Sequence, residues 1–262
     1  MAHRPQKKWG QNFLRNGGAA DRIVEALQPP PGGLILEIGP GEGMLTDRLA
    51  RLGNPVLALE IDPSLAASLQ GRFRGTPVEV RPGDATDEPL PEAPFWAVGN
   101  LPYNVATPIV RRVVASAGWR RAVFMFQKEV GDKITAAAGD PEYGFLTVTV
   151  GLRAEARTLM TLGPGSFRPA PKVRSTVVVL EPAERRLRTS VDQVEALASA
   201  AFRMRRKTLL NNLAGYGGLD REAAAAAIRA AGIDPAARAE TLDLDAFDRL
   251  AEAVRQRSLE GT

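Results

Sequence analysis

Short apolar runs alternate with helix-like segments over the first 180 residues of the chain. Seven runs have the length and composition of strands: residues 34–38, 56–60, 78–80, 95–98, 123–126, 157–161 and 176–180. The last two are expected to form an antiparallel pair. Strands that alternate with helices are typical of a parallel sheet covered on both faces and joined by right-handed crossovers. The pattern therefore predicts an α/β fold with a doubly wound, mostly parallel sheet of seven strands.

Helix signals occupy the segments between these runs. Residues 43–52 and 106–117 have helical patterns, and Asp62 followed by Pro63 is typical of an N-cap and a first helical position. After Pro182 no strand-like run remains. Helical features take over there: a capping box at 190–193, starts at Asp220 and Asp234-Pro235, and a stripe of Phe247, Leu250, Ala251 and Val254. We therefore expect an α/β domain over residues 1–182 and a small all-helical domain over 183–262.

Composition narrows the possible functions. Of the 262 residues, 44% are hydrophobic and 24% are charged, which is ordinary for a globular protein and excludes a mainly disordered chain. No apolar run approaches the ~20 residues of a membrane-spanning helix, and the N-terminus lacks the pattern of a secretory signal. Cysteine is absent and His3 is the one histidine, which argues against thiolate chemistry, a histidine metal site and a Ser-His-Asp triad. We expect a cytoplasmic protein with neither a metal nor a membrane partner.

The formal net charge of +4 matters less than its distribution. Four basic residues lie close together in the last third of the chain, namely Arg203, Arg205, Arg206 and Lys207. On a helix, such a run usually forms only a solvated face, but it is also typical of a surface that binds a polyanion.

Glycines at alternate positions follow the first predicted strand, in the segment Glu37-Ile38-Gly39-Pro40-Gly41-Glu42-Gly43. Glycine permits a tight turn and a close approach of a ligand to the backbone. Glu60 ends the second strand and can accept from both hydroxyls of a ribose, and Asp84 follows the third and can accept from an adenine amine. Because the carboxyl ends of parallel strands meet at one edge of the sheet, these motifs predict a nucleoside-binding site.

Two features argue against a dinucleotide cofactor. The G-x-G-x-G spacing of residues 39–43 differs from the G-x-G-x-x-G that is typical of pyrophosphate binding. In addition, Glu37 disfavours a phosphate but suits a cationic amino-acid or sulfonium group. The alternative is a plain strand–turn–helix without a ligand.

The tetrapeptide Asn100-Leu101-Pro102-Tyr103 follows the fourth predicted strand. Asn and Pro also favour turns, so a strand-end turn is the simpler interpretation. The exocyclic amine of adenine is, however, a poor nucleophile that such a motif can activate. The amide oxygen of Asn100 and a backbone carbonyl of Leu101 or Pro102 can bind its two hydrogens and direct its lone pair at an electrophilic methyl group. Tyr103 can stack on the base, and this catalysis by positioning needs no histidine.

Together these motifs resemble those of the rRNA adenine N6,N6-dimethyltransferases, which use S-adenosylmethionine. The resemblance covers residues 3–215 and is strongest to the small-subunit branch of the family. It rests on residues 7–14 (KKWGQNFL), 37–43, Glu60, 83–85 (GDA), 100–103, 126–130 (FQKEV), 167–173 (FRPAPKV), 206–209 (RKTL), Asn211 and Asn212. It implies a Rossmann-like class I methyltransferase sheet.

The resemblance also implies roles for individual residues. The N-terminal segment is expected to cap the cofactor, and Phe167 to form the wall of the base pocket opposite Tyr103. The implied cofactor contacts are Gln11, Asn12, Leu14, Glu37, Gly39, Gly41, Glu60, Ile61, Asp84, Ala85 and Asn100. The residues implied at the reacting base are Asn100, Leu101, Pro102, Tyr103 and Phe167. Trp9 and Asn12 stand where the family commonly has Phe and His, but they keep an aromatic and a polar group.

An RNA substrate changes the interpretation of the basic cluster, because Arg203, Arg205, Arg206 and Lys207 then become candidate phosphate contacts. The resemblance implies dimethylation of two adjacent adenines in the 3′-terminal hairpin loop of small-subunit rRNA, in ribosome biogenesis. The expected enzyme is a monomer that acts on a partly assembled small subunit. Its target adenines must be unstacked to enter the pocket.

Three alternatives belong to other functional classes. A large-subunit rRNA methyltransferase of the macrolide-resistance class is disfavoured by Leu101 and by the form of residues 167–173. A non-catalytic rRNA-binding assembly factor predicts decayed cofactor motifs, whereas these are intact. An NAD-dependent oxidoreductase predicts a pyrophosphate loop and a catalytic proton donor, and neither is evident.

Overall fold

The computed structural model describes residues 11–260, with side chains for 11–257. These residues form two compact units: one contains residues 11–135 with Ala154–Pro182, and the other contains Ala136–Arg153 with residues 183–260. The expected division placed 136–153 in the first domain, and the structure places this segment in the second unit instead. The physical reason is packing, because Tyr143, Val148 and Leu152 are buried in the core of the second unit.

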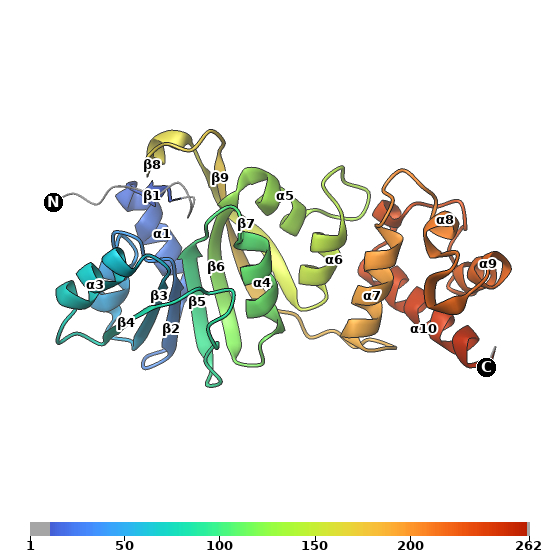
Figure 1. Cartoon of the computed structure of the whole chain (residues 1–262), viewed down its shortest axis with the longest axis horizontal. Coiled ribbons are helices and arrows are strands. Elements are labelled where there is room, and N and C mark those ends of the chain that lie inside the picture. Colours follow the sequence, from blue (N-terminus) through green and yellow to red (C-terminus); the bar gives the residue numbers. More distant parts are fainter. Residues whose placement is uncertain (1–10, 261–262) are drawn as a thin grey trace. The chain divides into compact units, whose positions relative to one another are not determined.

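A seven-stranded sheet with the order β4-β3-β2-β5-β6-β9-β7 forms the centre of the first unit (Figure 1). Its strands are β2 (Leu34–Ile38), β3 (Val56–Glu60), β4 (Val78–Pro82), β5 (Phe95–Asn100), β6 (Trp119–Gln127), β7 (Ala154–Leu162) and β9 (Ser175–Pro182). Pairing is parallel from β4 to β6, and β9 is antiparallel to both of its neighbours. The structure confirms the predicted sheet and its antiparallel pair.

Seven helical segments and two short strands complete the described part of the first unit. They are β1 (Phe13–Leu14), α1 (Gly17–Leu27), α2 (Thr46–Leu49), η2 (Ala50–Leu52), α3 (Pro63–Arg72), α4 (Ala106–Ala115), α5 (Lys128–Thr135), η3 (Pro164–Ser166) and β8 (Phe167–Arg168). As predicted, Asp62 caps α3 by accepting a hydrogen bond from the Ser64 amide. The helix predicted over 43–52 starts later, because Gly43 has a left-handed φ of 85° and belongs to a turn.

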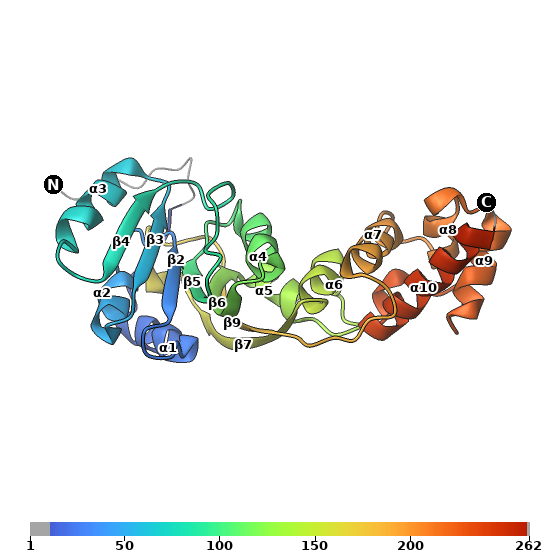
Figure 2. The same cartoon turned by 90° about the horizontal axis from the view of Figure 1, so that it is seen from below.

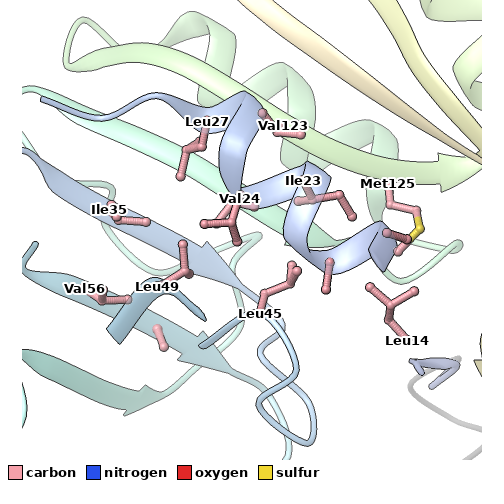
Figure 3. Packing of buried hydrophobic residues seen from close by; sticks show 14 of the residues in the cluster. Leu14, Ile23, Val24, Leu27, Ile35, Leu45, Leu49, Val56, Val123 and Met125 are labelled. Atoms are coloured by element: carbon pink, nitrogen blue, oxygen red, sulfur yellow. The ribbon is translucent and has the colours of Figure 1, made fainter. Parts of the chain in front are cut away.

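Helix α1 covers one face of the sheet, although the sequence patterns did not predict it. Its N-cap is Asn16, which accepts from the Ala19 amide. Figure 3 shows Ile23, Val24 and Leu27 of this helix among buried side chains of the sheet and of the segment after β2. Burial of each such side chain contributes about 1.5–3 kcal/mol to folding. This core holds the strand ends, and therefore the loops that follow them, in fixed positions.

Figure 2 shows α1 and α2 on one side of the sheet and α4 on the other. Along β6, Val123 and Met125 join the cluster under α1, and the buried Phe124 and Phe126 alternate with them. Because successive side chains of a strand point to opposite faces, both faces of the sheet are apolar and covered. A ligand therefore has access at the strand ends.

The second unit is all-helical, as predicted. Its segments are α6 (Phe145–Gly151), α7 (Val191–Ala201), α8 (Leu209–Leu213), η4 (Tyr216–Gly218), α9 (Arg221–Ala230), η5 (Ala239–Thr241) and α10 (Leu244–Glu260). Ser190 forms the predicted capping box of α7, and Asp220 caps α9. The helix predicted at Asp234-Pro235 is wrong: Asp234 accepts from the Ala236 amide in a turn. This turn instead provides the carbonyls that bind the first amides of α8.

Candidate active site

The carboxyl ends of β2, β3 and β5 surround a cavity in the first unit. Its lining comprises Gln11, Asn12, Phe13, Gly39, Gly41, Glu60, Ile61, Asn100, Leu101, Pro102 and Tyr103. A second cavity shares Phe13, Gly39, Gly41 and Asn100 with the first, and Leu14 and Glu37 also line it. The fold thus brings the glycine loop, the acid at the end of β3 and the Asn-Leu-Pro-Tyr motif to one place.

Glu60 is held rigidly at the end of β3. One carboxylate oxygen accepts from the Gly41 amide and the other from the Asp62 amide, each at 2.9 Å. The side chain is buried yet lines the cavity. Carboxylate oxygens have further lone pairs, so Glu60 can still accept from the hydroxyls of a ribose.

The glycine loop needs its glycines for two different reasons. Gly39 and Gly41 have φ values of 68° and 58°, in the left-handed region that favours glycine. A Cβ on Gly41 would also lie 2.8 Å from the ring of Phe13. The space above Gly41 is therefore taken by the N-terminal segment, whereas the sequence interpretation assigned it to the cofactor.

Contacts between described residues hold the N-terminal segment over the cavity. Strand β1 pairs with β8, which places Leu14 opposite Phe167. The side-chain amide of Gln11 donates to the Asp62 carboxylate at 3.2 Å, and the backbone carbonyl of Asn12 accepts from the Asn100 side chain at 2.7 Å. Residues 7–10 of the same motif lie outside the described residues.

The contact with Asn12 defines the orientation of the Asn100 amide. A backbone carbonyl only accepts hydrogen bonds, so the amide nitrogen of Asn100 must face it. The oxygen Oδ1 is thereby left as an acceptor, and it has no partner among the residues that the structure describes. The acceptor that adenine chemistry requires is thus available at the cavity.

Tyr103 lies in the turn between β5 and α4, and its side chain is half-buried. Its hydroxyl forms a hydrogen bond of 2.9 Å with Oγ of Ser175, the first residue of β9. Burial raises the pKa of the Tyr103 phenol, and the bond to Ser175 partly offsets this rise. The phenol therefore stays neutral at physiological pH.

Glu37 is a buried acid at the second cavity. Neither of its carboxylate oxygens has a hydrogen-bond partner of normal geometry among the described residues. Burial raises the pKa of Glu37 to about 8; Thr46 opposes this rise, and the negative charges of Glu60 and Asp47 add to it. The carboxyl is therefore mostly neutral at pH 7 until a cation lies near it.

Asp62 is ionised under the same conditions. Desolvation works to raise its pKa, but hydrogen bonds from Ser64 and Gln11 outweigh this and hold the pKa below the usual range. Asp62 thus anchors Gln11 of the N-terminal segment as well as capping α3. The sequence interpretation identified only its role as a cap.

Three predicted site residues do not line either cavity. Asp84 uses one oxygen to accept from the amide and the hydroxyl of Thr86 in a turn after β4. Ala85 is buried, and its carbonyl accepts from Arg112. Phe167 packs into the apolar core beside Leu14, and the β1–β8 pairing explains this position.

The charges around the two cavities fit a cationic nucleoside. Among the described lining residues none is basic, whereas Glu37, Glu42 and Glu60 are acidic. Such a site disfavours a pyrophosphate and suits a ligand with sulfonium and ammonium groups. The described residues also contain no group of three or more side chains able to hold a metal ion, and none of their helices has the length and apolar character to cross a membrane.

The basic cluster lies in the second unit, in the connection between α7 and α8. Its four members are exposed: Arg203, Arg205, Arg206 and Lys207. The helix predicted for them is wrong, because the buried side chain of Asn212 bonds the backbone of Ala201 and Met204 and so ends α7 there. Arg205 donates to the Pro141 carbonyl.

Ser175, which contacts Tyr103, is a residue that the sequence interpretation did not identify. The only signal is its position, two residues beyond the 167–173 segment. Its contact with Tyr103 joins residues 72 apart in the chain, and no local pattern reveals such a pair.

Comparison with known proteins agrees with this geometry. The family model for ribosomal RNA adenine dimethylase matches residues 2–256. The chain is 43% identical to ribosomal RNA small subunit methyltransferase A of Methylococcus capsulatus, over 93% of this chain and 95% of that protein. It is 39% identical to the protein of the same name from Pseudomonas putida, over 96% of both.

Two solved structures are similar over most of the chain. The dimethyladenosine transferase from Plasmodium falciparum has a TM-score of 0.83 and 26% identity, covering 94% of this chain and 98% of that one. The 23S rRNA methyltransferase ErmE has a TM-score of 0.74 and 29% identity, covering 94% and 100%. Both similarities include the seven-stranded sheet and the helical unit.

Proposed function

Since the chain belongs to the ribosomal RNA adenine dimethylase family, we propose that it dimethylates adenines of small-subunit rRNA with S-adenosylmethionine as the methyl donor. Its targets are the exocyclic amines of two adjacent adenines in the 3′-terminal hairpin loop, and the reaction belongs to ribosome biogenesis. The observation that carries this proposal is the orientation of Asn100, whose Oδ1 is a free acceptor at the cavity.

The cofactor site is formed by the strand ends and the N-terminal segment. Glu60 is placed to accept from the ribose, and Gln11, Asn12 and Leu14 to cover the bound nucleoside. Glu37 is buried beside this site and can ionise when the cationic group of the ligand lies near it. When bound, S-adenosylmethionine supplies an electrophilic methyl group on a sulfonium. Asp84 keeps one oxygen outside its turn that can accept from the adenine amine of the cofactor, with Ala85 beside it.

The reacting adenine is activated by two acceptors. Oδ1 of Asn100 accepts a hydrogen bond from one N–H of the amine, and a backbone carbonyl accepts one from the other N–H. The Pro102 carbonyl already accepts from the Val105 amide, so the Leu101 carbonyl is the better second acceptor. Tyr103 stacks on the base and aligns the nitrogen lone pair with the methyl group. Phe167 supports the N-terminal segment from the core and in this way shapes the pocket opposite Tyr103. Catalysis is then positioning and electrostatic stabilisation, and the proton leaves after transfer.

A small-subunit substrate is favoured over a large-subunit one. The small-subunit relatives are 43% and 39% identical over at least 93% of this chain, whereas the 23S rRNA methyltransferase is 29% identical. A non-catalytic assembly factor needs no oriented amide at the cavity, and an oxidoreductase needs a phosphate site that the lining lacks.

The exposed cluster of Arg203, Arg205, Arg206 and Lys207 is proposed to bind RNA phosphates. Three of these cations have no ion pair among the described residues, and the fourth, Arg205, is 3.9 Å from Glu240. Phosphate contacts position RNA without reading its sequence. The substrate we propose is the rRNA in a partly assembled small subunit, bound by one copy of the chain.

Transfer of labelled methyl groups from S-adenosylmethionine tests the proposed function. The acceptors are unmethylated small subunits, large-subunit rRNA and a control without RNA, and the modified bases are mapped. We expect dimethyladenine in the 3′-terminal hairpin loop of the small-subunit rRNA. Label confined to large-subunit rRNA would move the chain to the macrolide-resistance class, and cofactor binding without any transfer would support the assembly-factor alternative.

A further inference from the structure

The contact between Tyr103 and Ser175 joins the loop after β5 to the start of β9, which lies two strands away in the sheet. The two oxygens are 2.9 Å apart. Ser175 is fully buried, and it pairs in register with Gln127 of β6 and Leu162 of β7. Its hydroxyl is therefore a fixed point, since strands on both sides hold its backbone.

Tyr103 has no such support from its own segment. It lies in the turn of residues 103–105 before α4, and its ring is half-exposed at the cavity. The backbone at Pro102 fixes the start of the turn but leaves the χ angles of the next residue free. The hydroxyl contact is the one interaction that fixes the far end of this ring among the hydrogen bonds of the described residues.

We propose that Ser175 is a positioning residue for methyl transfer: its buried hydroxyl holds the ring of Tyr103 in the plane on which the target adenine stacks. This inference rests on the proposed function, because it concerns the alignment of the adenine amine. A ring anchored at both ends keeps the amine nitrogen in line with the methyl donor. Small misalignments of reacting atoms lower rates strongly.

The segment that carries Ser175 adds to the argument. β8, with Phe167 and Arg168, leads through residues 169–174 directly into Ser175. The same segment therefore holds the N-terminal cap at one end, through Leu14 opposite Phe167, and Tyr103 at the other. This arrangement links the position of the Tyr103 ring to the N-terminal segment that covers the cofactor site.

The test compares Ser175→Ala, Tyr103→Phe and the double variant with wild type. Each single variant removes the same hydrogen bond, and Tyr103→Phe keeps a ring for stacking. A hydrogen bond of this kind corresponds to an effect of about 3- to 10-fold. We expect kcat to fall by about that factor in each single variant, with the Kd for S-adenosylmethionine unchanged. The double variant should resemble the singles, since the effects of partners in one contact do not add.

The neighbouring Thr176 offers a matched control. It is buried on the same strand, and its hydroxyl has no hydrogen-bond partner among the described residues. Thr176→Val removes a buried hydroxyl without removing the contact to Tyr103, so its kcat should equal that of wild type. The proposal is overturned if Ser175→Ala and Thr176→Val behave alike, or if the double variant shows the product of the two single effects.

The ratio of mono- to dimethyladenine among the products is a second measurement. General destabilisation of the protein does not change this ratio. A loosely held ring aligns the bulkier monomethylated amine less well than the unmodified one. We therefore expect monomethyladenine to accumulate in Ser175→Ala and Tyr103→Phe. An unchanged ratio of mono- to dimethyladenine at equal turnover would contradict the positioning role.

Fluorotyrosine NMR separates this inference from the proposed function. The chain has three tyrosines, so the resonance of Tyr103 can be assigned with Tyr103→Phe. It should shift or broaden in Ser175→Ala but not in Thr176→Val, without any RNA present. If wild type methylates no small-subunit rRNA, the proposed function fails, while this spectrum still decides whether Ser175 holds the ring.

Discussion

The side chain of Asn100 is oriented by a backbone carbonyl that lies 88 residues earlier in the chain. The carbonyl of Asn12 selects the amide nitrogen and leaves the oxygen to the cavity. The same principle operates at Glu60, where two backbone amides hold the carboxylate, and at Tyr103, where Ser175 holds the hydroxyl. At the scale of residues, the site consists of polar groups that hydrogen bonds orient, most of them from distant parts of the chain.

Asn100→Ala tests the acceptor directly. The substitution removes Oδ1, so the amine loses a hydrogen-bond acceptor at the moment when positive charge develops on its nitrogen. We expect kcat to fall by about 100-fold or more, while binding of S-adenosylmethionine in calorimetry stays measurable. Asn100→Asp is the matched variant: it keeps an acceptor but repels the Asn12 carbonyl, and should also be impaired. Wild-type turnover in both variants would refute the assignment.

Glu37 predicts how stability depends on pH. Its pKa is raised from 4.5 to about 8 in the folded protein, so the folded state binds this proton more tightly than the unfolded chain. Stability from this group is therefore fully present below about pH 4.5, and it is lost progressively as the pH rises from there to about 8. Glutamine does not ionise, so Glu37→Gln does not lose this stability at high pH. The variant should therefore have a melting temperature a few degrees above that of wild type at pH 9.

Thermal unfolding of the ligand-free proteins at pH 5 and pH 9 checks this expectation. At pH 5 the wild-type carboxyl is neutral, and the two proteins should melt at similar temperatures. If the two melting temperatures differ equally at both pH values, the glutamine side chain stabilises the fold for a reason other than charge.

At the scale of elements, the short strand β1 connects the two parts of the site. It pairs with β8, and its residue Phe13 lies directly over Gly41 of the glycine loop. The flanking Gln11 and Asn12 reach Asp62 and Asn100. One segment thus both closes the proposed cofactor site and orients the amide that we propose to be catalytic.

Gly41→Ala tests this arrangement. The new Cβ would lie 2.8 Å from the ring of Phe13, and the φ of 58° is unfavourable for alanine. We expect the N-terminal segment to be displaced and the affinity for S-adenosylmethionine to fall by about tenfold or more, as measured by calorimetry.

Gly53→Ala is the matched control for backbone strain. Gly53 has a φ of 75°, and a Cβ there meets nothing within 4 Å. This variant should lose stability but keep its affinity for the cofactor. Equal affinities in both variants would show that strain, and not contact with Phe13, explains the need for glycine at position 41.

At the scale of the whole molecule, the proposed function assigns separate tasks to the two units. The first contains both cavities, and the second presents the exposed basic connection between α7 and α8. An enzyme that methylates RNA needs a site for chemistry and a surface for phosphates. Under the proposed function, each lies in a unit with its own core.

Reversal of charge at the connection tests its role. Arg206→Glu with Lys207→Glu should weaken RNA binding and lower the slope of log K against log salt by about 1.4–1.8, because two phosphate contacts are lost. Binding titrations between 50 and 200 mM salt measure both quantities. Arg229→Glu with Arg255→Glu makes the same change of net charge at other exposed positions of the second unit, and its slope should equal that of wild type. Equal slopes in both double variants would identify the cluster as a solvated surface.

The sequence by itself determined the elements whose signals are local. The period of apolar residues predicted all seven strands of the sheet, and side-chain caps predicted the starts of α3, α7 and α9. These features depend on residues within about four positions of one another, so a sequence shows them directly. The glycine loop, Glu60 and the Asn-Leu-Pro-Tyr motif were identifiable for the same reason, as each is contiguous or ends a strand.

Only the tertiary structure decided the contacts between distant residues. Residues 136–153 join the helical unit because their apolar side chains fit its core, and α7 ends before Arg203 because the buried Asn212 bonds its last turn. Likewise Phe167 packs in the core and Ser175 reaches Tyr103 through the pairing of β8 and β9 with their neighbours. Such contacts stabilise the protein only after the chain has folded, so no periodicity or spacing along the sequence encodes them.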